Sequence, residues 1–190
     1  MSELKKSWKL STILVVLLVG LVAALGIFLF IKKRKASEIT DENDVPEVEE
    51  DDDDIILQYY KVISDGLDSE GLTDETLHRL ATAQSMHETG IFASNLLKSN
   101  KNLFGMMMPS KRPTVATGKA NGFAQYESAL DSARDYAMYY KYVGYPETFQ
   151  DVKSFVSALK AKAYFEDNLT TYMSGVASHY KKLNQLLNVG

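Results

Sequence analysis

The longest uncharged apolar segment in this chain of 190 residues runs from Leu10 to Ile31. Its 22 residues would form a helix about 33 Å long, enough to cross the hydrocarbon core of a bilayer. The segment ends directly in the basic run 32–35, without the small-residue cleavage site of a secretory signal. The sequence therefore predicts one uncleaved transmembrane helix over residues 10–31, which contacts the lipid bilayer and follows a basic flank over residues 1–9.

The charges that flank the apolar segment do not decide which side of the membrane the rest of the chain occupies. Lys5, Lys6, Lys9 and the amino terminus precede the segment, and the basic run 32–35 follows it. The side richer in Lys and Arg usually stays in the cytoplasm. Because the two flanks are nearly balanced, they leave the orientation open.

Residues 32–54 form a basic and then acidic segment, which we interpret as a linker. Between Ala36 and Asp54, 11 of 19 residues are acidic. A run of like charges repels itself and buries too little apolar area to fold. We expect an unfolded spacer that holds the following domain away from the membrane. A solvated tail without that role fits the same composition.

This acidic linker accounts for the net charge of −4 of the chain. Residues 55–190 alone carry 14 Lys and Arg against 13 Asp and Glu. They contain no basic stripe with interleaved aromatic residues, so the sequence predicts no nucleic-acid partner. The absence of cysteine excludes disulfides, thiolate zinc sites and cysteine nucleophiles. His78, His87 and His179 form no ligand set by their spacing, and we predict neither a metal site nor a cofactor.

Residues 55–190 are predicted to form one mainly helical domain with a small β-hairpin lobe. Apolar residues recur at helical spacing, and turn or capping residues mark the ends of the segments. The expected helices cover residues 55–67, residues 73–89, a segment that begins at Ser128, a segment that begins at Thr148 and carries apolar residues to Leu159, and residues 170–187. Between Gly105 and Tyr126 the helical period stops. We expect two short strands there, near Val115 and over residues 123–126.

Glu88 is notable within the second expected helix because of the residues that share its face. Leu77, Ala81 and Gln84 precede it at spacings of four, three and four, so these side chains point to one side. A carboxyl group on an inward face loses hydration, which raises its pKa and favours the protonated form. Such a group fits the general acid of a glycoside-cleaving reaction. An ion pair with a basic residue such as Lys98 fits the same position.

Glu88 also lies in the first of three motifs that occur together in this chain. The motifs are Ala83-Gln84 followed by Glu88-Thr89-Gly90, then Asn102-Leu103-Phe104-Gly105, then Phe123 to Tyr126 followed by Ser128 and Asp135-Tyr136. In this combination they resemble the mannosyl-glycoprotein endo-β-N-acetylglucosaminidase-like domain of glycoside hydrolase family 73. This family includes bacterial and phage peptidoglycan glucosaminidases. The resemblance runs from Leu77 to about Tyr172, which is about half of the chain.

The resemblance implies a lysozyme-like α+β fold and an enzyme that cleaves β-1,4 bonds in the glycan strands of peptidoglycan. It implies Glu88 as the general acid and Tyr126 as a cleft residue beside the reacting sugar. The turn from Asn102 to Gly105 is expected to form the floor between two lobes. The residues expected to contact the substrate are Gln84, Asn102, Phe104, Arg112, Tyr136 and Tyr172.

Several aromatic and basic residues of this region also fit structural roles that involve no substrate. Core packing is favoured for Phe104, Tyr139 and Tyr140. Arg112 and Lys111 fit either contacts with the carboxylates of the peptide stems or a solvated loop.

A second catalytic carboxylate has no obvious position. Glycosidases with two carboxylates use the second as base or nucleophile, and many members of this family carry it in the β-lobe. This chain has no Asp or Glu between Gly105 and Tyr126. Glu127 or Asp131 is the candidate second carboxylate, with Asp135 the next one along the chain. Alternatively, the 2-acetamido group or the 6-hydroxyl of the substrate attacks the sugar, and we favour Glu88 as the one protein carboxylate required.

Other functions remain open at this point. One is a lytic transglycosylase or a muramidase that acts on the same polymer. Another is a non-catalytic lysozyme-like protein that binds glycan or has a structural role in a virion. Because peptidoglycan lies outside the cytoplasmic membrane, we expect a single-pass membrane protein, either of the bacterial inner membrane with a periplasmic or extracellular domain or of a membrane-containing phage virion. The sequence leaves the oligomeric state open.

Overall fold

The computed structural model describes residues 51–188 of the chain. The predicted basic flank (1–9), transmembrane helix (10–31) and nearly all of the predicted linker (32–54) lie outside these residues and stay predictions. Within residues 51–188, no helix is long and apolar enough to cross a membrane. The expected contact with a bilayer therefore rests on the sequence alone.

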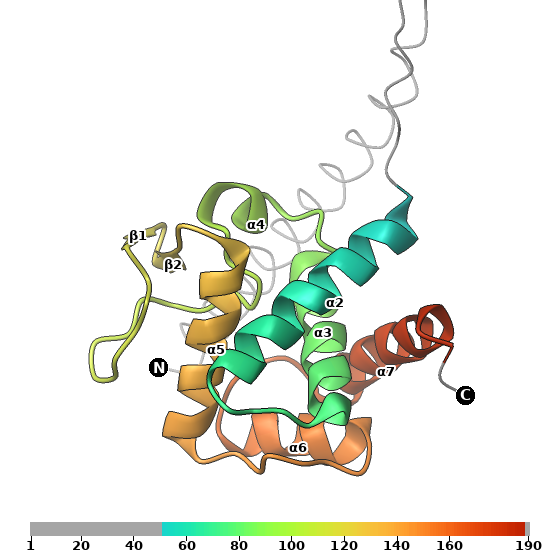
Figure 1. Ribbon diagram of the computed structural model, residues 1–190. Helices are drawn as coiled ribbons and strands as arrows, with labels where there is room; N and C mark the ends of the chain where they lie inside the picture. The colour runs from blue at the N-terminus through green and yellow to red at the C-terminus, as the bar shows by residue number, and fades with distance from the viewer. Residues whose placement is uncertain (1–50, 189–190) are drawn as a thin grey trace, which may run out of the picture. The chain divides into compact units, whose positions relative to one another are not determined.

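The described part is mainly helical and carries a small antiparallel β-hairpin (Figure 1). The elements follow in the order α2 (Asp52–Ser69), α3 (Glu75–Thr89), α4 (Asn95–Asn100), β1 (Gly118–Ala120), β2 (Phe123–Gln125), α5 (Ala129–Val143), α6 (Val152–Ala161) and α7 (Leu169–Leu186). This confirms the predicted mainly α domain with a β-hairpin lobe.

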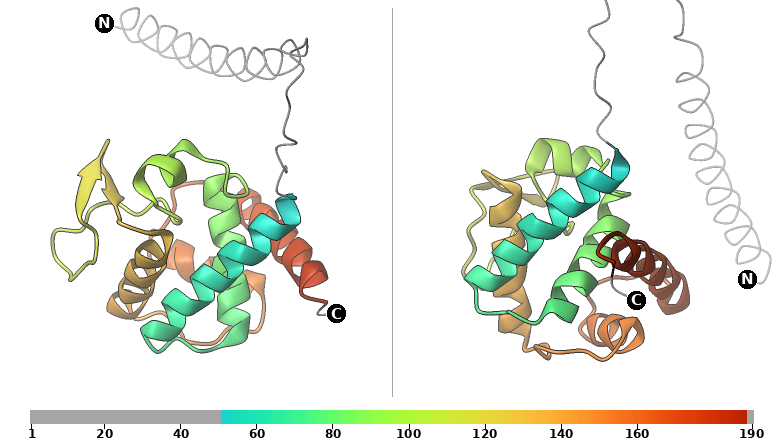
Figure 2. Two further views of the ribbon diagram at one scale, coloured as in Figure 1. Left: turned by 45° about the horizontal axis from the view of Figure 1, so that its top comes forward. Right: turned by 45° about the vertical axis from the view of Figure 1, so that its right-hand side comes forward.

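Helix α3 is the central helix of the domain. It packs against α2 and α7, while α2 also packs against α5, and α6 packs against α7 (Figures 1 and 2). Ten of its 15 residues are buried, so α3 is enclosed beyond the single inward face that its sequence predicts. Its buried hydroxyl groups donate to backbone carbonyls, Thr82 to His78 and Ser85 to Leu103. These bonds allow a helix with few large apolar residues to lie in the core.

Both ends of α3 carry capping residues. At the N-terminus, the Asp74 side chain accepts a hydrogen bond from the backbone N–H of Leu77. At the C-terminus, Gly90 adopts the left-handed conformation with φ 59° and stops the helix after Thr89. The predicted end of this helix is confirmed. Because the helix stops there, Glu88 lies in its last turn.

Helix α2 begins inside the predicted acidic linker. Asp51 caps it by accepting a hydrogen bond from the backbone N–H of Asp53 at 3.3 Å, and Asp52, Asp53 and Asp54 form its first turn. Negative side chains are favourable at a helix N-terminus, where backbone N–H groups lack partners. The prediction that the linker stays unfolded to Asp54 is therefore wrong for its last three residues.

The β-hairpin differs from the prediction in its first strand. β1 and β2 pair with Gly118 opposite Gln125. Between the strands, Asn121 and Gly122 both have positive φ, 54° and 87°. A two-residue hairpin turn requires this conformation, and asparagine and glycine accept it. The turn places β1 at residues 118–120, so the strand predicted near Val115 is wrong, whereas the second strand is confirmed.

The remaining helices follow their capping residues. Ser128 caps α5 as predicted, by accepting a hydrogen bond from the backbone N–H of Asp131 at 3.1 Å. Helix α6 begins after Asp151 rather than at Thr148, because Asp151 and Ser154 form a reciprocal capping box. Helix α7 lies within one residue of its predicted bounds at both ends. Helix α4 is not predicted, since six residues are too few to show a helical period.

Gly66 in α2 allows α2 and α5 to approach closely. A Cβ atom on Gly66 would collide with the Cβ of Ala133 and lie 3.1 Å from its carbonyl carbon.

We predict that Gly66→Ala lowers the free energy of unfolding by about 1–3 kcal/mol, because two rigid helix backbones must separate. Urea unfolding measures this change. The exposed Gln58→Ala in the same helix is the control, with a change below about 0.5 kcal/mol, and unaltered stability of Gly66→Ala would contradict the close packing.

Candidate active site

An open cleft with a volume of about 900 Å³ lies beside the C-terminal end of α3. Four parts of the chain line it: the end of α3, the segment between α4 and β1, helix α5, and the segment from α6 into α7. The cleft therefore brings Glu88 together with residues far along the chain, such as Tyr172, which follows it by 84 positions.

Glu88 presents its carboxyl group to this cleft. One oxygen, Oε1, accepts a hydrogen bond from the hydroxyl of Tyr172 at 2.6 Å. The other oxygen, Oε2, faces Gly105, where a Cβ atom would lie 3.8 Å away from it. Among residues 51–188, no lysine or arginine forms an ion pair with Glu88, so the alternative of a pair with Lys98 is not observed.

The surroundings of Glu88 favour its protonated form. Loss of hydration on burial raises the pKa of Glu88 above its ordinary value, and the hydrogen bond from Tyr172 opposes this rise only in part. The neighbouring His87 also lowers the pKa of Glu88, and the negative charge of Asp167, the smallest of these causes, raises it. The direction agrees with the prediction from the inward helix face. A carboxyl group that keeps its proton closer to neutral pH can donate it to a leaving oxygen.

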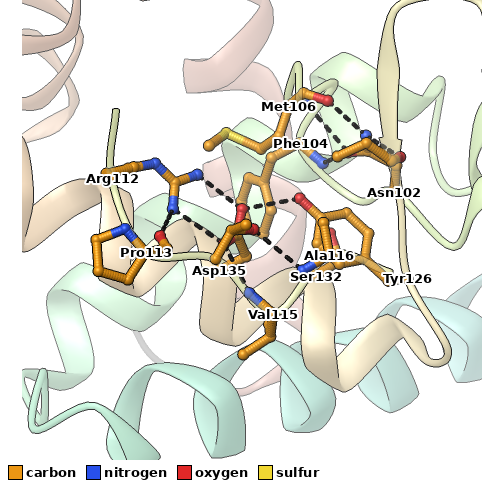
Figure 3. Close-up of polar contacts among 12 residues, drawn as sticks. Asn102, Phe104, Met106, Arg112, Pro113, Val115, Ala116, Tyr126, Ser132 and Asp135 are labelled. Carbon is orange, nitrogen blue, oxygen red and sulfur yellow. Dashed lines mark hydrogen bonds and ion pairs between the residues drawn. The ribbon is translucent and has the colours of Figure 1, made fainter. Parts of the chain in front are cut away.

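A buried ion pair connects the segment before β1 to helix α5 (Figure 3). The guanidinium of Arg112 donates to both carboxylate oxygens of Asp135, at 2.9 and 2.7 Å. The hydroxyl of Tyr126 donates to the same carboxylate at 3.0 Å, and so does the backbone N–H of Val115 at 3.4 Å. Burial alone would raise the pKa of Asp135, but the Arg112 guanidinium and neighbouring hydroxyl groups hold it below its ordinary value. Asp135 is therefore a charged anchor for this segment.

These contacts alter the expected roles of Arg112 and Tyr126. The Arg112 side chain lines the cleft, but it is only 5% exposed and its charge is already paired. It is neither part of a solvated loop nor a free cation for a stem carboxylate. Tyr126 is 5% exposed and lies outside the cleft lining. Burial and the Asp135 carboxylate raise the pKa of Tyr126 well above its ordinary value, so its hydroxyl stays a hydrogen-bond donor to Asp135.

Asn102 holds together the turn that leads into the β-lobe (Figure 3). Its Nδ2 donates to the backbone carbonyls of Met106 at 2.8 Å and of Ala124 at 3.0 Å. Its Oδ1 accepts a hydrogen bond from the backbone N–H of Met106 at 3.0 Å. The turn joins the β-lobe to the helices as expected. The Asn102 side chain itself is fully buried and is used inside the protein, rather than toward a substrate.

Gln84 and Tyr136 lie behind the cleft. Tyr136 donates its hydroxyl to Oε1 of Gln84 at 2.7 Å, and both side chains are fully buried. The Tyr136 ring stacks on Phe104, with 3.9 Å between ring centroids. Phe104 lines the cleft but is almost fully buried, as is Tyr140. Both therefore agree with the simpler role of core packing.

The aromatic residue of the cleft with an open ring is Tyr142, which the sequence analysis does not single out. Its exposed fraction is 61%, against 3% for Tyr172. The Tyr172 ring is covered by Phe165, with 3.7 Å between centroids, so its face is not open to a sugar. Met107, which is also well exposed, lines the cleft as well. On α5 the helical period separates Tyr142 from the buried Tyr136 and Tyr140, but exposure alone does not identify a residue that lines the cleft.

The carboxylates expected as a second acid lie elsewhere. Glu127 is exposed just before α5 and is not part of the cleft lining. Asp131 accepts a hydrogen bond from the hydroxyl of Ser128 at 2.7 Å and also lies outside the lining. The carboxylates that line the cleft with Glu88 are Glu166 and Asp167. Within residues 51–188, no three His, Asp or Glu side chains gather into a metal-binding group.

The sequence model of the glucosaminidase family, described as mannosyl-glycoprotein endo-beta-N-acetylglucosaminidase, matches residues 69–185. This chain belongs to that family. The match is longer at both ends than the stretch in which the motifs were recognised. Family membership makes the domain a glycoside hydrolase of the kind that acts on peptidoglycan, as the resemblance predicts. No curated protein matches the chain.

Solved structures similar to this glucosaminidase-family domain share its fold. A type VI secretion system effector–immunity complex from Pseudomonas protegens matches with a TM-score of 0.55 and 16% identity, over 70% of this chain and 92% of that chain. The catalytic domain of the autolysin Auto from Listeria monocytogenes matches with a TM-score of 0.51 and 19% identity, over 85% of this chain and 96% of that chain. At these identities the likeness concerns the fold, and it agrees with the expected lysozyme-like architecture.

Removing Arg112 from this glucosaminidase-family domain would leave the buried Asp135 carboxylate without its cation. We predict that Arg112→Met lowers the free energy of unfolding at pH 7 by about 3–5 kcal/mol. The double variant Arg112→Met/Asp135→Asn also removes the unpaired charge and should recover part of the loss. Urea unfolding compares the two variants, and equal losses in both would contradict a buried ion pair.

The same pair predicts a pH dependence of stability. Because the pKa of Asp135 in the folded chain lies below its ordinary value of 3.8, its contribution is complete above that pH. The contribution is lost as the pH falls through the lower, folded value. The stability difference between the unmodified protein and the double variant should therefore shrink below about pH 4. A difference that stays constant down to pH 2 would exclude this linkage.

Tyr172→Phe tests the environment of Glu88. The lost hydrogen bond stabilises the charged carboxylate, so we predict that the pKa of Glu88 rises further above its ordinary value in this variant. A carbon-13 NMR titration of the Glu88 carboxyl group measures the shift. Tyr180→Phe in the same helix is the matched control and should leave the pKa of Glu88 unchanged. A lower pKa in Tyr172→Phe would refute the proposed contact.

Proposed function

We propose that the protein is a membrane-anchored peptidoglycan hydrolase of the endo-N-acetylglucosaminidase type, with Glu88 as its general acid. The observation that carries this proposal is the position of Glu88 in a member of the glucosaminidase family. Its carboxyl group has a raised pKa, no lysine or arginine partner among residues 51–188, and access to an open cleft. These are the properties required to protonate the oxygen of a β-1,4 glycosidic bond.

The two carboxyl oxygens of Glu88 have different surroundings, and we assign them different roles. Tyr172 donates to Oε1, and within residues 51–188 no hydrogen bond engages Oε2. Oε2, which faces Gly105, carries the proton that is donated in this proposal. In this proposal the glycosidic oxygen approaches Oε2, and the Tyr172 hydroxyl stabilises the carboxylate that remains after the proton has left.

The chemistry of the cleft suits a glycan strand with peptide stems. A volume of about 900 Å³ accommodates several sugar rings. Tyr142 and Met107 offer exposed apolar surface for the faces of sugar rings. Lys111 is exposed at the same cleft and, in place of the paired Arg112, supplies a cation for stem carboxylates. The similar autolysin catalytic domain supports the bacterial cell wall as the substrate.

The predicted helix over residues 10–31 adds membrane anchoring to the proposal. An anchor would keep the domain close to a membrane and replace a separate wall-binding module. In one arrangement the anchor lies in the bacterial inner membrane and the domain lies in the periplasm or outside the cell. In the other arrangement the anchor lies in the membrane of a phage virion. Protease accessibility in spheroplasts tests the first arrangement, and a domain protected from added protease would rule it out.

A lytic transglycosylase or a muramidase is the second candidate function. It is favoured by the lack of a carboxylate between Gly105 and Tyr126, since a lytic transglycosylase needs one protein acid. A non-catalytic glycan-binding or virion structural protein is a third candidate. It predicts binding to purified cell wall without release of fragments.

Substitution of Glu88 tests the proposed activity. We predict that Glu88→Gln in the full-length chain lowers the release of dye from labelled, purified cell wall by about 10²–10⁴-fold, because the amide has no proton to donate. Glu127→Gln and Asp131→Asn are matched controls outside the cleft and should stay within about two-fold of the unmodified protein. Full activity of Glu88→Gln would refute its role as the acid, and inactivity of the unmodified protein would refute the proposed function.

A further inference from the structure

The segment Ala163–Asp167, which follows α6, forms one wall of the cleft. We call it the acidic wall, because Glu166 and Asp167 belong to it and both line the cleft with Glu88. Neither has a role in the mechanism with Glu88 alone. No Asp or Glu occurs in the β-lobe between Gly105 and Tyr126, and within residues 51–188 Glu166 and Asp167 are the carboxylates that line the cleft besides Glu88.

Lys160 fixes the backbone of the acidic wall. Its Nζ donates to three consecutive carbonyls, those of Phe165 at 3.3 Å, Glu166 at 3.1 Å and Asp167 at 2.8 Å. The same ammonium lies 4.8 Å from the centre of the Phe165 ring, in a cation–π contact. An ammonium has three N–H donors, and here all three serve one short segment. These contacts tie the backbone of the wall to α6, although the wall belongs to no helix or strand.

A chain of contacts connects this wall to Glu88. The Phe165 ring stacks on the Tyr172 ring, with 3.7 Å between centroids and 3° between planes. The Tyr172 hydroxyl in turn donates to Glu88 at 2.6 Å. Because each contact is direct, the position of the acidic wall is set relative to the carboxyl group of Glu88. Two catalytic groups that act on one substrate must keep a fixed geometry relative to each other.

We propose that Asp167 is the second carboxylate of the reaction and acts on the attacking water. This inference rests on the proposed function. Glu88 donates its proton to the glycosidic oxygen, and the electron pair of the C1–O bond goes to that oxygen. Asp167 accepts a proton from water, whose oxygen forms the new bond to C1. Glu88 ends as a carboxylate and Asp167 ends protonated. Proton exchange with solvent returns both groups to their starting states.

The two carboxyl groups lie in environments that suit these opposite tasks. Glu88 is half-buried, whereas Asp167 is exposed to solvent, where water can reach it. They share no hydrogen bond within residues 51–188, so they do not hold one proton between them. The charge of Asp167 raises the pKa of Glu88, while that of its neighbour Glu166 does not contribute. Asp167 is therefore the residue of the wall that is coupled to the acid.

Asp167→Asn, with Glu166→Gln as the matched control, tests this inference in the full-length chain on purified peptidoglycan. We expect Asp167→Asn to lower kcat by about 100-fold or more, and Glu166→Gln to stay within about two-fold. Azide should restore fragment release by Asp167→Ala, because this anion attacks C1 without a base. The pKa of Glu88, followed by carbon-13 NMR, should fall in Asp167→Asn, since a negative charge has been removed.

Each result separates this inference from the proposed function. Near-normal activity of Asp167→Asn, an equal loss in Glu166→Gln, or the absence of either the azide rescue or the fall in the Glu88 pKa would overturn the role of Asp167. In those cases an inactive Glu88→Gln would leave the proposed function standing. Inactivity of the unmodified protein on peptidoglycan would overturn both.

Discussion

The enclosure of α3 among other helices is the constraint on which the cleft depends. The helix packs against α2 and α7, and Gly90 ends it two residues after Glu88. Ten buried side chains would have to move before α3 could rotate. The Glu88 carboxyl group therefore has one position, with Tyr172 at one oxygen and Gly105 near the other. The raised pKa of Glu88 follows from this position, because loss of hydration is its largest cause.

Two charged side chains hold parts of the cleft that have little regular structure. The segment between α4 and β1 is tied to α5 by the ion pair of Arg112 with Asp135. The acidic wall is tied to α6 by Lys160, through backbone carbonyls rather than a carboxylate. Both cations, Arg112 and Lys160, therefore stabilise the walls of the cleft and are not free to bind a substrate. Among the polar lining groups, the proposed function gives Glu88, Tyr172 and the exposed Lys111 a role toward the substrate.

The spacing of residues predicts those features of the structure that depend on neighbours in sequence. The face shared by Leu77, Gln84 and Glu88 predicts both the burial of α3 and the direction of the Glu88 pKa shift. Capping residues predict the C-terminal end of α3 and the start of α5. The starts of α3 and α6 differ from the prediction, because these helices begin after Asp74 and Asp151 rather than near Thr73 and Thr148. The first strand also differs, because a strand near Val115 ignores the register that the turn at residues 121–122 imposes.

Polar residues of the site could not be assigned in this way, because their roles depend on partners distant in sequence. The Tyr136 hydroxyl donates to Gln84 across 52 positions in the sequence, and the Tyr126 hydroxyl donates to Asp135 rather than facing the cleft. Asp167 and Glu88 line the same cleft although they lie 79 positions apart in the sequence. Mass spectrometry of the fragments released from purified peptidoglycan in water enriched in oxygen-18 tests hydrolysis by Glu88 directly. If Glu88 is the acid of a glucosaminidase, the fragments have a reducing N-acetylglucosamine end that carries one solvent oxygen, and Glu88→Gln releases none. An anhydro-N-acetylmuramic acid end, or the same fragments from Glu88→Gln, would contradict it.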